Sequence, residues 1–257
     1  MITIRNLTHR YKNRSETALQ NINLHIERGE VVVLLGLSGA GKSTLIKCID
    51  RLIEPTCGSI LINGKDILTA NTKKTEELRR SIGLIFQEFN LIERTTVLDN
   101  VLNGRLGYIG VVRTFFNKFR TQDYEIAENN LRQVGLFDLR YERASNLSGG
   151  QRQRVAIARV LSQEPQIILA DEPVSSLDPK LMKEIMDLLQ RLCREKGIAL
   201  VTSLHFLEFV KKYASRVVGL RDGIVVFDGS IQDITEKDLV CIYGEAKDWH
   251  INGKTGF

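Results

Sequence analysis

The spacing of apolar and polar residues changes along the chain. Apolar and polar residues alternate over 1–11 and again over 18–30, which predicts two strands, the second ending in an Arg-Gly turn. The run "VVVLLG" at 31–36 is continuously apolar, as is typical of a strand that is buried on both faces. Residues 42–53 place apolar side chains at helical spacing, and 58–67 predict a short strand and a turn.

The later part of the chain separates a helical stretch from further strands. "RRSIGLIFQ" at 79–87 predicts a strand, and helical periodicity dominates from 88 to 163. Buried strands are predicted at 166–173 and 198–204 with an amphipathic helix between them, and 215–229 predict a hairpin around an Asp-Gly turn. Strands that alternate with helices favour an α/β fold with a mostly parallel sheet.

The predicted elements divide a single domain into parts. Residues 1–87 and 164–244 would form the α/β core together with an antiparallel β subdomain, and 88–163 would form an inserted α-helical lobe. Residues 245–257 are polar and contain glycine, which indicates a C-terminal tail.

Composition narrows the class of protein. The 257 residues are 43% apolar and 26% charged, as in an ordinary folded domain. The N-terminus lacks the apolar segment of a secretory signal, and no run approaches the roughly 18 apolar residues of a membrane span, so we expect a cytosolic protein. The four cysteines form no CxxC pair, which favours reduced thiols over a zinc site. A net charge of +5 is only a mild indication of anionic partners.

The segment "GLSGAGKS" matches the pattern GxxxxGK[ST] and lies between a predicted buried strand and a helix, the context that a P-loop requires. Glycines let backbone N–H groups turn around phosphate oxygens, and the helix N-terminus adds the positive end of its dipole. Lys42 would supply a point charge to the β- and γ-phosphates, and Ser43 would bind Mg²⁺. The candidate nucleotide-binding residues are Gly36, Ser38, Gly39, Ala40, Gly41, Lys42, Ser43 and Thr44.

Two adjacent acidic residues end the apolar run "IILADE". Asp171 is placed to hold Mg²⁺, directly or through water, and Glu172 is placed to orient or deprotonate an attacking water. Adjacent acids at the end of a strand are usually solvated turn residues. A complete P-loop in the same chain favours the catalytic interpretation.

The segment "LSGGQRQRVAIAR" predicts a second anion site. Ser148, Gly149 and Gly150, followed by Gln151, expose backbone N–H groups at the start of a helix that is separate from the P-loop. Two anion sites in one chain are explained if two chains meet head to tail and each caps the nucleotide of the other. A serine N-cap with a glycine turn is the ordinary interpretation of the tripeptide alone.

Together these motifs resemble those of the nucleotide-binding subunits of ATP-binding-cassette (ABC) transporters. "LSGGQ", the P-loop and "LADEPVSSLDP" occur in the order of that family, and the resemblance extends over about 2–244. It implies a P-loop NTPase (RecA-like) fold, ATP and Mg²⁺ as cofactors, and a dimer of ATPase subunits. It also implies that Tyr11 stacks on adenine and that Asp178 communicates between the two sites of the dimer.

The same resemblance implies two further site residues. Gln87 matches the glutamine that contacts Mg²⁺ or the attacking water and senses the membrane partner. His205 matches the switch histidine and follows a strand that we expect beside the strand of the two acids. Leu204 and Phe206 stand where family members often carry Thr and Asp, which leaves the hydrogen-bond neighbours of His205 open. The expected catalytic residues are Lys42, Gln87, Glu172 and His205, and the expected Mg²⁺ ligands are Ser43, Gln87 and Asp171.

A finer resemblance is to the ATPase subunits of phosphonate importers (the PhnC family), carried by "LRRSIGLIFQEFNLIERTTVLDNVLNGRLG", "DEPVSSLDP" and "GLRDGIVVFDG". It implies an ATP-driven importer with two separate permease subunits, an extracytoplasmic binding protein and a peripheral position on the cytoplasmic side of the inner membrane. Import of phosphite, phosphate or an amino acid is an alternative, because the cassette is not expected to touch the solute. An ABC ATPase that acts on nucleic acid is disfavoured, since the sequence has neither a coiled coil nor a zinc insertion. A simple P-loop kinase has no need for "LSGGQ".

The stretch 100–119 combines four aromatic residues with three cations. Val101, Leu102 and Leu106 fall at helical spacing and favour a place in the core of the lobe. For 108–119, one hypothesis is docking on the permease near the lipid headgroups, and the alternative is helices packed within the lobe. The docking hypothesis uses Phe115, Phe116 or Phe119 as apolar anchors and Arg113 or Lys118 near anionic lipid.

Overall fold

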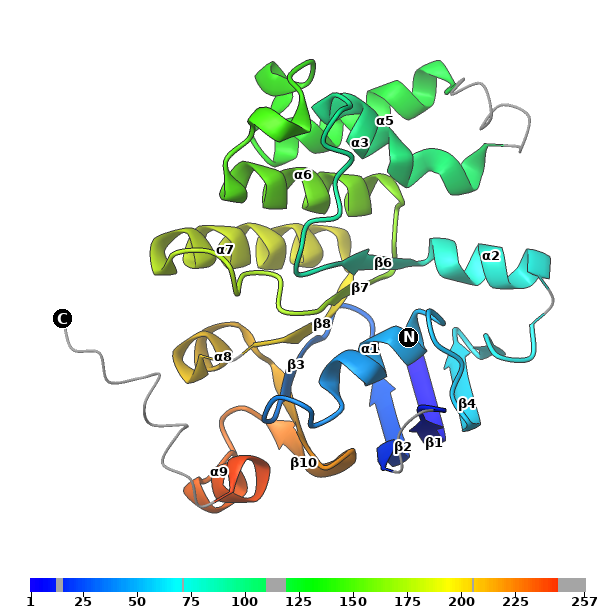
Figure 1. Cartoon of the computed structure of the whole chain (residues 1–257), viewed down its shortest axis with the longest axis vertical. Coiled ribbons are helices and arrows are strands. Elements are labelled where there is room, and N and C mark those ends of the chain that lie inside the picture. Colours follow the sequence, from blue (N-terminus) through cyan, green and yellow to red (C-terminus); the bar gives the residue numbers. More distant parts are fainter. Residues whose placement is uncertain (13–15, 71, 110–118, 205, 245–257) are drawn as a thin grey trace.

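The computed structural model describes residues 1–12, 16–70, 72–109, 119–204 and 206–244. These residues form two sheets and the helices that cover them (Figure 1). One sheet has six strands in the order β10-β9-β3-β8-β7-β6, and the other has four in the order β2-β1-β4-β5.

The six-stranded sheet is parallel except at one edge. β3 pairs in parallel with β8 and β9, β8 with β7, and β7 with β6, whereas β10 is antiparallel to β9. Its strands are β3 (Val31–Leu35), β6 (Ile82–Ile85), β7 (Ile167–Ala170), β8 (Ala199–Ser203), β9 (Arg216–Arg221) and β10 (Ile224–Ser230). The predicted mostly parallel sheet and the predicted C-terminal hairpin are thus confirmed.

The second sheet is antiparallel throughout. Ile2 of its central strand lies opposite Ile26 on one side and Ile62 on the other, and all three side chains are buried. Its strands are β1 (Ile2–Arg10), β2 (Thr17–Ile26), β4 (Cys57–Ile62) and β5 (Lys65–Asp66). This sheet is the predicted antiparallel β subdomain.

Helices lie on both faces of the parallel sheet and in a separate group, which we call the helical lobe (Figure 1). The helices outside the lobe are α1 (Lys42–Ile49), α2 (Thr72–Arg80), α7 (Pro179–Lys196), α8 (Leu207–Tyr213) and α9 (Glu236–Tyr243). The described elements of the lobe are α3 (Val97–Leu102), α5 (Thr121–Gln133) and α6 (Gly149–Ser162), with the 3₁₀ helices η1 (Asn103–Tyr108), η2 (Phe137–Leu139) and η3 (Ala144–Asn146). The assignment of Arg79 and Arg80 to a strand was wrong, because these residues end α2 and only the four residues of β6 pair with β7.

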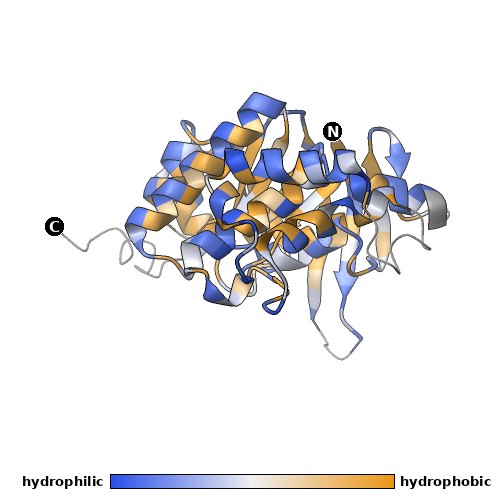
Figure 2. Cartoon of the chain, turned by 90° about the horizontal axis from the view of Figure 1, so that it is seen from above, coloured by the Kyte–Doolittle hydropathy of each residue, from blue (hydrophilic) through white to orange (hydrophobic). Residues whose placement is uncertain are grey.

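The burial of β3 on both faces follows from its alternating side chains. Val33 and Leu35 enter the core that is shared with the lobe and α7, whereas Val32 and Leu34 enter the core that is shared with α1 and the antiparallel sheet. Figure 2 shows the apolar positions gathered between the layers and the polar ones on the outer faces of the helices. The strand that leads into the P-loop is therefore held from both sides.

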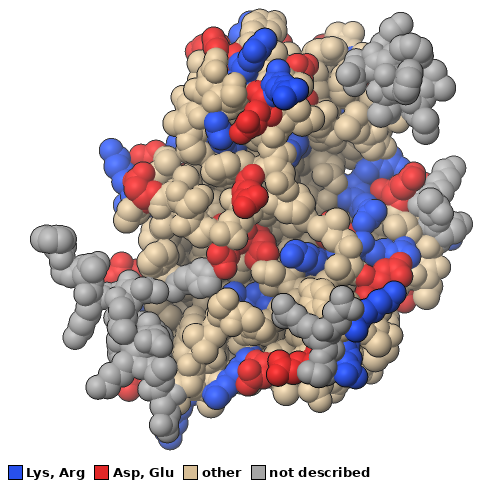
Figure 3. Space-filling view, viewed as in Figure 1, with Lys and Arg blue, Asp and Glu red and all other residues tan. Residues whose placement is uncertain are grey.

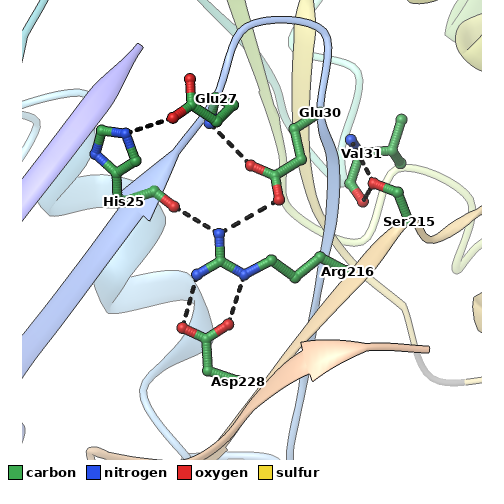
Figure 4. Close-up of polar contacts among 7 residues, drawn as sticks. All are labelled: His25, Glu27, Glu30, Val31, Ser215, Arg216 and Asp228. Atoms are coloured by element: carbon green, nitrogen blue, oxygen red, sulfur yellow. Dashed lines mark hydrogen bonds and ion pairs between the residues drawn. The ribbon is translucent and has the colours of Figure 1, made fainter. Parts of the chain in front are cut away.

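Arg216 at the start of β9 connects the two sheets (Figure 4). Its guanidinium binds both carboxylate oxygens of Asp228 on β10, and it also pairs with Glu30 at 3.3 Å. It donates a further hydrogen bond of 2.6 Å to the carbonyl oxygen of His25 on β2. The hydrogen bond to Asp228 raises the pKa of Arg216, so the cation is retained at any pH at which the protein is folded.

The stretch 100–119 is described only in part. Val101 and Leu102 are fully buried, as predicted, and Leu106 is half-buried. Phe119 packs against the lobe core, with its ring centroid 6.2 Å from that of Tyr124. The remaining anchors of the docking hypothesis, Arg113, Phe115, Phe116 and Lys118, lie outside the described residues, as does the tail 245–257. Within the described ranges, no helix is both long enough and apolar enough to cross a bilayer.

Candidate functional site

The P-loop turns from β3 into α1, where the motif predicted it. Gly36, Gly39 and Gly41 have φ angles of 145°, 85° and 107°, which favour glycine over residues with a side chain. At Gly41 the requirement is also steric, because a Cβ there would lie 2.8 Å from the carbonyl oxygen of Ala18 and 2.9 Å from Leu19 Cδ2. Left-handed glycines before a helix N-terminus are the geometry that presents successive backbone N–H groups to an anion.

Lys42, the first residue of α1, is only 5% exposed. Its Nζ donates hydrogen bonds to the carbonyl oxygens of Gly36 at 2.7 Å and Leu37 at 3.0 Å. Burial lowers the pKa of the Lys42 ammonium, and the charges of Glu172 and Asp171 act in the opposite direction. The loop therefore encloses a cation that two nearby carboxylates help to keep charged.

A chain of hydroxyl and carboxylate groups joins the P-loop to the ends of two strands. Ser43 Oγ donates to Asp171 Oδ1 at 2.9 Å, and Ser203 Oγ donates to the same oxygen at 3.1 Å. Ser203 Oγ also accepts a 2.8 Å hydrogen bond from the backbone N–H of Glu172. Ser203 is fully buried and was not among the predicted site residues. Its place at the end of a predicted buried strand, at the carboxyl edge of the sheet, was the available signal.

The donor set of this chain suits a magnesium ion. Mg²⁺ prefers oxygen ligands, keeps several waters and usually binds through one or two protein groups plus phosphate oxygens. Ser43 Oγ and Asp171 Oδ1 are such oxygen donors and lie 2.9 Å apart. In the part of the chain that the structure describes, no group of three or more His, Cys, Asp and Glu side chains is arranged to hold a metal. Phosphate oxygens and water are the ligands that usually complete a magnesium site of this kind.

Glu172 has a left-handed backbone with φ 48°, which is uncommon for a residue with a Cβ. Such a conformation costs about 1 kcal/mol or more and persists where neighbouring groups hold it. Here the Glu172 N–H is bound by Ser203, and the Glu172 carbonyl accepts a 3.3 Å hydrogen bond from the N–H of Ser175. The side chain of Glu172 lies in the wall of the same cleft as the P-loop.

The cleft has a volume of about 1080 Å³, at the upper end for ligand sites in proteins. Both sheets contribute to its walls, since the backbone N–H of Gln20 on β2 donates at 2.8 Å to the carbonyl of Gly223 in the β9–β10 turn. The lining residues are Tyr11, Lys12, Glu16, Thr17, Ala18, Ser38, Gly39, Gly41, Lys42, Ser43, Thr44, Glu172, Asp222 and Gly223. Most of the predicted P-loop residues are therefore brought together with Tyr11 and Glu172.

Tyr11 is fixed at the cleft wall by contacts on two sides. Its hydroxyl lies 3.2 Å from Thr44 Oγ1 of α1. The ring of His9 meets the Tyr11 ring edge to face, with centroids 4.6 Å apart, and His9 Nδ1 lies 3.0 Å from the carbonyl oxygen of Glu54. An aromatic ring supported in this way is suited to stack on a flat base.

The start of α6 has the predicted capped geometry. Ser148 Oγ accepts from the Gln151 N–H at 3.4 Å, and Gln151 Oε1 accepts from the Ser148 N–H at 2.9 Å. Gly150 is needed for packing, because a Cβ there would lie 2.6 Å from a methyl group of Leu181 on α7. Ser148, Gly149, Gly150 and Gln151 are not among the residues that line the P-loop cleft of their own chain, and α6 lies in the lobe, apart from α1 (Figure 1). The second anion site therefore stays a prediction.

Among the described residues, the cleft lining lacks five other predicted residues, namely Gly36, Ala40, Gln87, Asp171 and Asp178. Gln87 is exposed in the turn after β6, and Asp178 caps α7 by accepting a 3.0 Å hydrogen bond from the Leu181 N–H. His205 lies outside the described residues. The strand that precedes it, β8, pairs with β7 as expected, so the ends of β8, β7 and β6 lie side by side at one edge of the sheet.

The comparison with known protein families is decisive. A family model described as "ABC transporter" matches residues 19–175, which include the P-loop, the start of α6 and the acidic pair. The chain belongs to the ABC transporter family. The family resemblance that the motifs carried is thereby confirmed.

Curated relatives extend this match over most of the ABC chain. The phosphonates import ATP-binding protein PhnC of Shouchella clausii is 51% identical over 244 residues, 95% of this chain and 91% of that protein. The protein of the same name from Wolinella succinogenes is 49% identical over 255 residues, 99% of this chain and 92% of that protein.

Solved structures confirm the expected ABC fold. The dimeric post-hydrolysis state of the ATP-binding cassette MJ0796, bound to ADP and Pi, superimposes with a TM-score of 0.78 at 34% identity and covers 91% of this chain and 100% of that one. The structure of cbiO1 from Clostridium perfringens, part of the ABC transporter complex cbiONQ, has a TM-score of 0.79 at 32% identity and covers 93% of this chain and 92% of that one. The P-loop NTPase core with its antiparallel sheet is therefore the fold of an ABC ATPase.

Proposed function

We propose that the chain hydrolyses ATP to drive an importer of phosphonates or related phosphorus oxyanions. It would act on the cytoplasmic side of the inner membrane, with two permease subunits and an extracytoplasmic binding protein. The observation that carries the hydrolytic part is the cleft in which Lys42, Ser43 and Glu172 meet, with Asp171 bonded to Ser43. The solute is supported by the relatives that are named phosphonates import ATP-binding proteins.

Lys42 and the P-loop backbone would bind the phosphates of ATP. Mg²⁺, when bound at Ser43 and Asp171, would neutralise charge on the phosphate oxygens. The hydrogen bond from Ser203 orients the Asp171 carboxylate toward Ser43 before any ligand arrives. Hydrogen bonds of this kind commonly fix the orientation of metal ligands in proteins.

Glu172 would orient the attacking water and accept its proton while the water oxygen bonds to the γ-phosphorus and ADP leaves. Its backbone is fixed by Ser203, so the carboxylate is presented from a rigid strand end. Gln87 and His205 would complete the group of catalytic residues, because they follow β6 and β8, the strands on either side of β7. Gln87 would contact Mg²⁺ or the attacking water, and His205 would sense the γ-phosphate.

We assign the start of α6 to the nucleotide of a second subunit. Ser148, Gly149, Gly150 and Gln151 form a capped helix N-terminus that does not line the cleft of their own chain, and an anion is what such a terminus binds. In a head-to-tail homodimer each chain would cap the other's ATP, and Asp178 would lie between the two sites. The lobe, residues 88–163, would move as a unit against the core at 1–87 and 164–244 when the dimer opens.

The permease contact is assigned to a groove of about 390 Å³ between the core and the lobe. Leu52 at this groove is 48% exposed, and the exposed Asn90 also lines it. Burial raises the pKa of Asp50 to about 6, so a carboxyl group is kept here in an unfavourable environment. This combination suits a cytoplasmic permease segment that brings an apolar side chain and a hydrogen-bond donor. The lining residues are Asp50, Leu52, Arg79, Ile82, Leu84, Phe86, Asn90, Asn103, Gly104, Arg159, Val160 and Gln163.

Replacing Glu172 by Gln tests the hydrolytic assignment. The variant should bind ATP, form a stable dimer with ATP and Mg²⁺ in size-exclusion chromatography, and lose at least about a hundredfold in turnover, because the amide cannot accept the proton. Lys42→Ala should instead abolish ATP binding. A Glu172→Gln variant that stays monomeric with normal turnover would remove Glu172 from the mechanism.

Uptake by the reconstituted transporter identifies the solute. Proteoliposomes with the complete permease and binding protein should accumulate phosphonates in an ATP-dependent manner, and a panel of phosphite, phosphate and amino acids would show whether another small solute is preferred. DNA and RNA should leave ATP turnover unchanged. On the face in Figure 3, acidic and basic side chains are interspersed, unlike the one-sign surface of a nucleic-acid-binding protein.

A further inference from the structure

The loop that follows Gln87 has two consecutive residues in the left-handed region. Phe89 has φ 51° and Asn90 has φ 49°. Asn tolerates this region, but a phenylalanine there is uncommon, and two such residues in succession are disfavoured by their own sterics. The loop therefore needs contacts from elsewhere in the molecule to keep this conformation.

Arg159 of α6 supplies those contacts. One guanidinium nitrogen donates to the carbonyl oxygen of Asn90, and the other donates at 2.9 Å to that of Phe89. The Arg159 side chain is half-buried, and this burial lowers its pKa. The planar fork of the guanidinium thus holds both left-handed peptides with two separate nitrogens, a rigid geometry that the single ammonium of a lysine does not reproduce.

The other end of the same helix carries the predicted second anion site. Ser148 caps α6, and Arg159 lies eleven residues further along, which corresponds to about 16 Å of helix. The helix is one uninterrupted element between these points. A change in the position of the capped end therefore moves the guanidinium that holds the loop.

We infer that Arg159 is a positioning residue that holds the Gln87 loop and couples it to the nucleotide-capping end of α6. The inference rests on the proposed function, in which Gln87 contacts Mg²⁺ or the attacking water. We call the hydrogen bonds from Arg159 to the carbonyl oxygens of Phe89 and Asn90 the clamp. Arg159 and Asn90 also line the groove between the core and the lobe, so a partner bound there would contact both the arginine and the loop.

A second set of hydrogen bonds also attaches the lobe to the core. Gln163, beyond the end of α6, donates from its side-chain amide to the carbonyl oxygens of Ile82 at 2.6 Å and Arg79 at 2.8 Å. Removal of the Arg159 guanidinium should therefore free the loop and leave the lobe in place. A local effect on the loop is what the experiment has to separate from a general loss of structure.

The full-length chain is assayed for steady-state ATP turnover, for binding of a fluorescent ATP analogue and for thermal unfolding. Arg159→Met should lower kcat by about ten- to a hundredfold, since displacing a positioned group by an ångström has effects of this size, and should change the ATP dissociation constant less than about twofold. Arg159→Lys should fall between Met and the wild type. Arg154→Met, on the same helix and bound to Val134 and Glu184 instead, is the matched control and should keep its kcat.

A double-mutant cycle separates positioning from packing. If Arg159 acts through Gln87, adding Arg159→Met or Arg159→Lys to Gln87→Ala should lower kcat little further. If the kcat losses of the Gln87 and Arg159 substitutions multiply in the double variant, the inference is overturned. It is also overturned if a lower unfolding temperature and a weaker ATP affinity explain the whole kcat loss of both Arg159→Met and Arg159→Lys. A wild-type chain that does not hydrolyse ATP would refute the proposed function, whereas an active wild type with unaffected Arg159 variants would refute only the clamp.

Discussion

Asp50 is a carboxyl group in an environment that disfavours its charge. It follows α1 at the groove between the core and the lobe, where burial raises its pKa from 3.8 to about 6 and the charge of Arg79 opposes the rise only in part. We predict that Asp50→Asn makes the isolated subunit more stable at neutral pH. The reason is that the amide fills nearly the same volume and carries no charge to desolvate.

The sign and the size of the expected change in stability both follow from the raised pKa of Asp50. Because the pKa in the folded state lies above that in the unfolded state, the native carboxyl binds its proton more tightly. Its contribution to stability is complete below about pH 4 and is lost as the pH rises through about 6. A difference of about two units corresponds to about 3 kcal/mol at 1.36 kcal/mol per unit. This value is an upper limit, because the Asp50 side chain retains some contact with water.

Urea unfolding followed by circular dichroism at pH 7.5 and pH 5 measures the effect. The free energy of unfolding of Asp50→Asn should exceed that of the wild type by up to about 3 kcal/mol at pH 7.5, and by about half as much at pH 5. Glu54→Gln is the control, since the Glu54 side chain is 74% exposed and its pair with Arg51 should contribute less than about 0.5 kcal/mol at either pH. An Asp50→Asn variant with the same gain at both pH values, or with none at pH 7.5, would refute the reasoning.

Three further changes test other parts of the structure. Arg216→Ala should lower the free energy of unfolding by about 1–3 kcal/mol, because it leaves Asp228 without its cation, and an unchanged urea midpoint would contradict this. Gly41→Ala should weaken binding of a fluorescent ATP analogue by more than about tenfold while circular dichroism stays native, because the new methyl has no room in the loop. Ser203→Ala should lower kcat by about ten- to a hundredfold with little change in KM, because Asp171 and the backbone of the neighbouring acid each lose a partner. A change confined to KM would show that the serine acts on binding instead.

The parts of the fold and site that the sequence predicted depend on local patterns. The P-loop is a contiguous motif with its own glycine requirement, and β3 is a contiguous apolar run, so each could be recognised without knowledge of the rest of the chain. Capping of α6 by Ser148 is likewise decided within four residues. The capping of α7 by Asp178, with proline at the first turn, is equally local but was not predicted, because Asp178 was considered only for its role in the dimer.

The parts that the sequence did not predict depend on contacts between distant residues. Ser203 acts on Asp171 across two strands, and Arg159 reaches a loop that lies 70 residues away in the chain. The raised pKa of Asp50 results from burial, which no local pattern records. Arg79 was assigned to the strand because it lies only a few residues before it in the sequence. In the structure it belongs to α2, and its side chain donates hydrogen bonds to backbone carbonyls at the end of α1. Tertiary contacts decide such positions, and periodicity does not reveal them.

The nucleotide cleft is built across the boundary between the two sheets, and this has a consequence for the life of the protein in the cell. Tyr11 and Ala18 come from the antiparallel side, Lys42 and Gly223 come from the parallel side, and an unfolded chain has no such cleft. A nucleotide bound there joins the two halves and, at a free concentration one hundred times its dissociation constant, adds about 2.7 kcal/mol to the stability of the fold. Subunits that lose their nucleotide would therefore open more often, and be degraded sooner, than subunits that hold it.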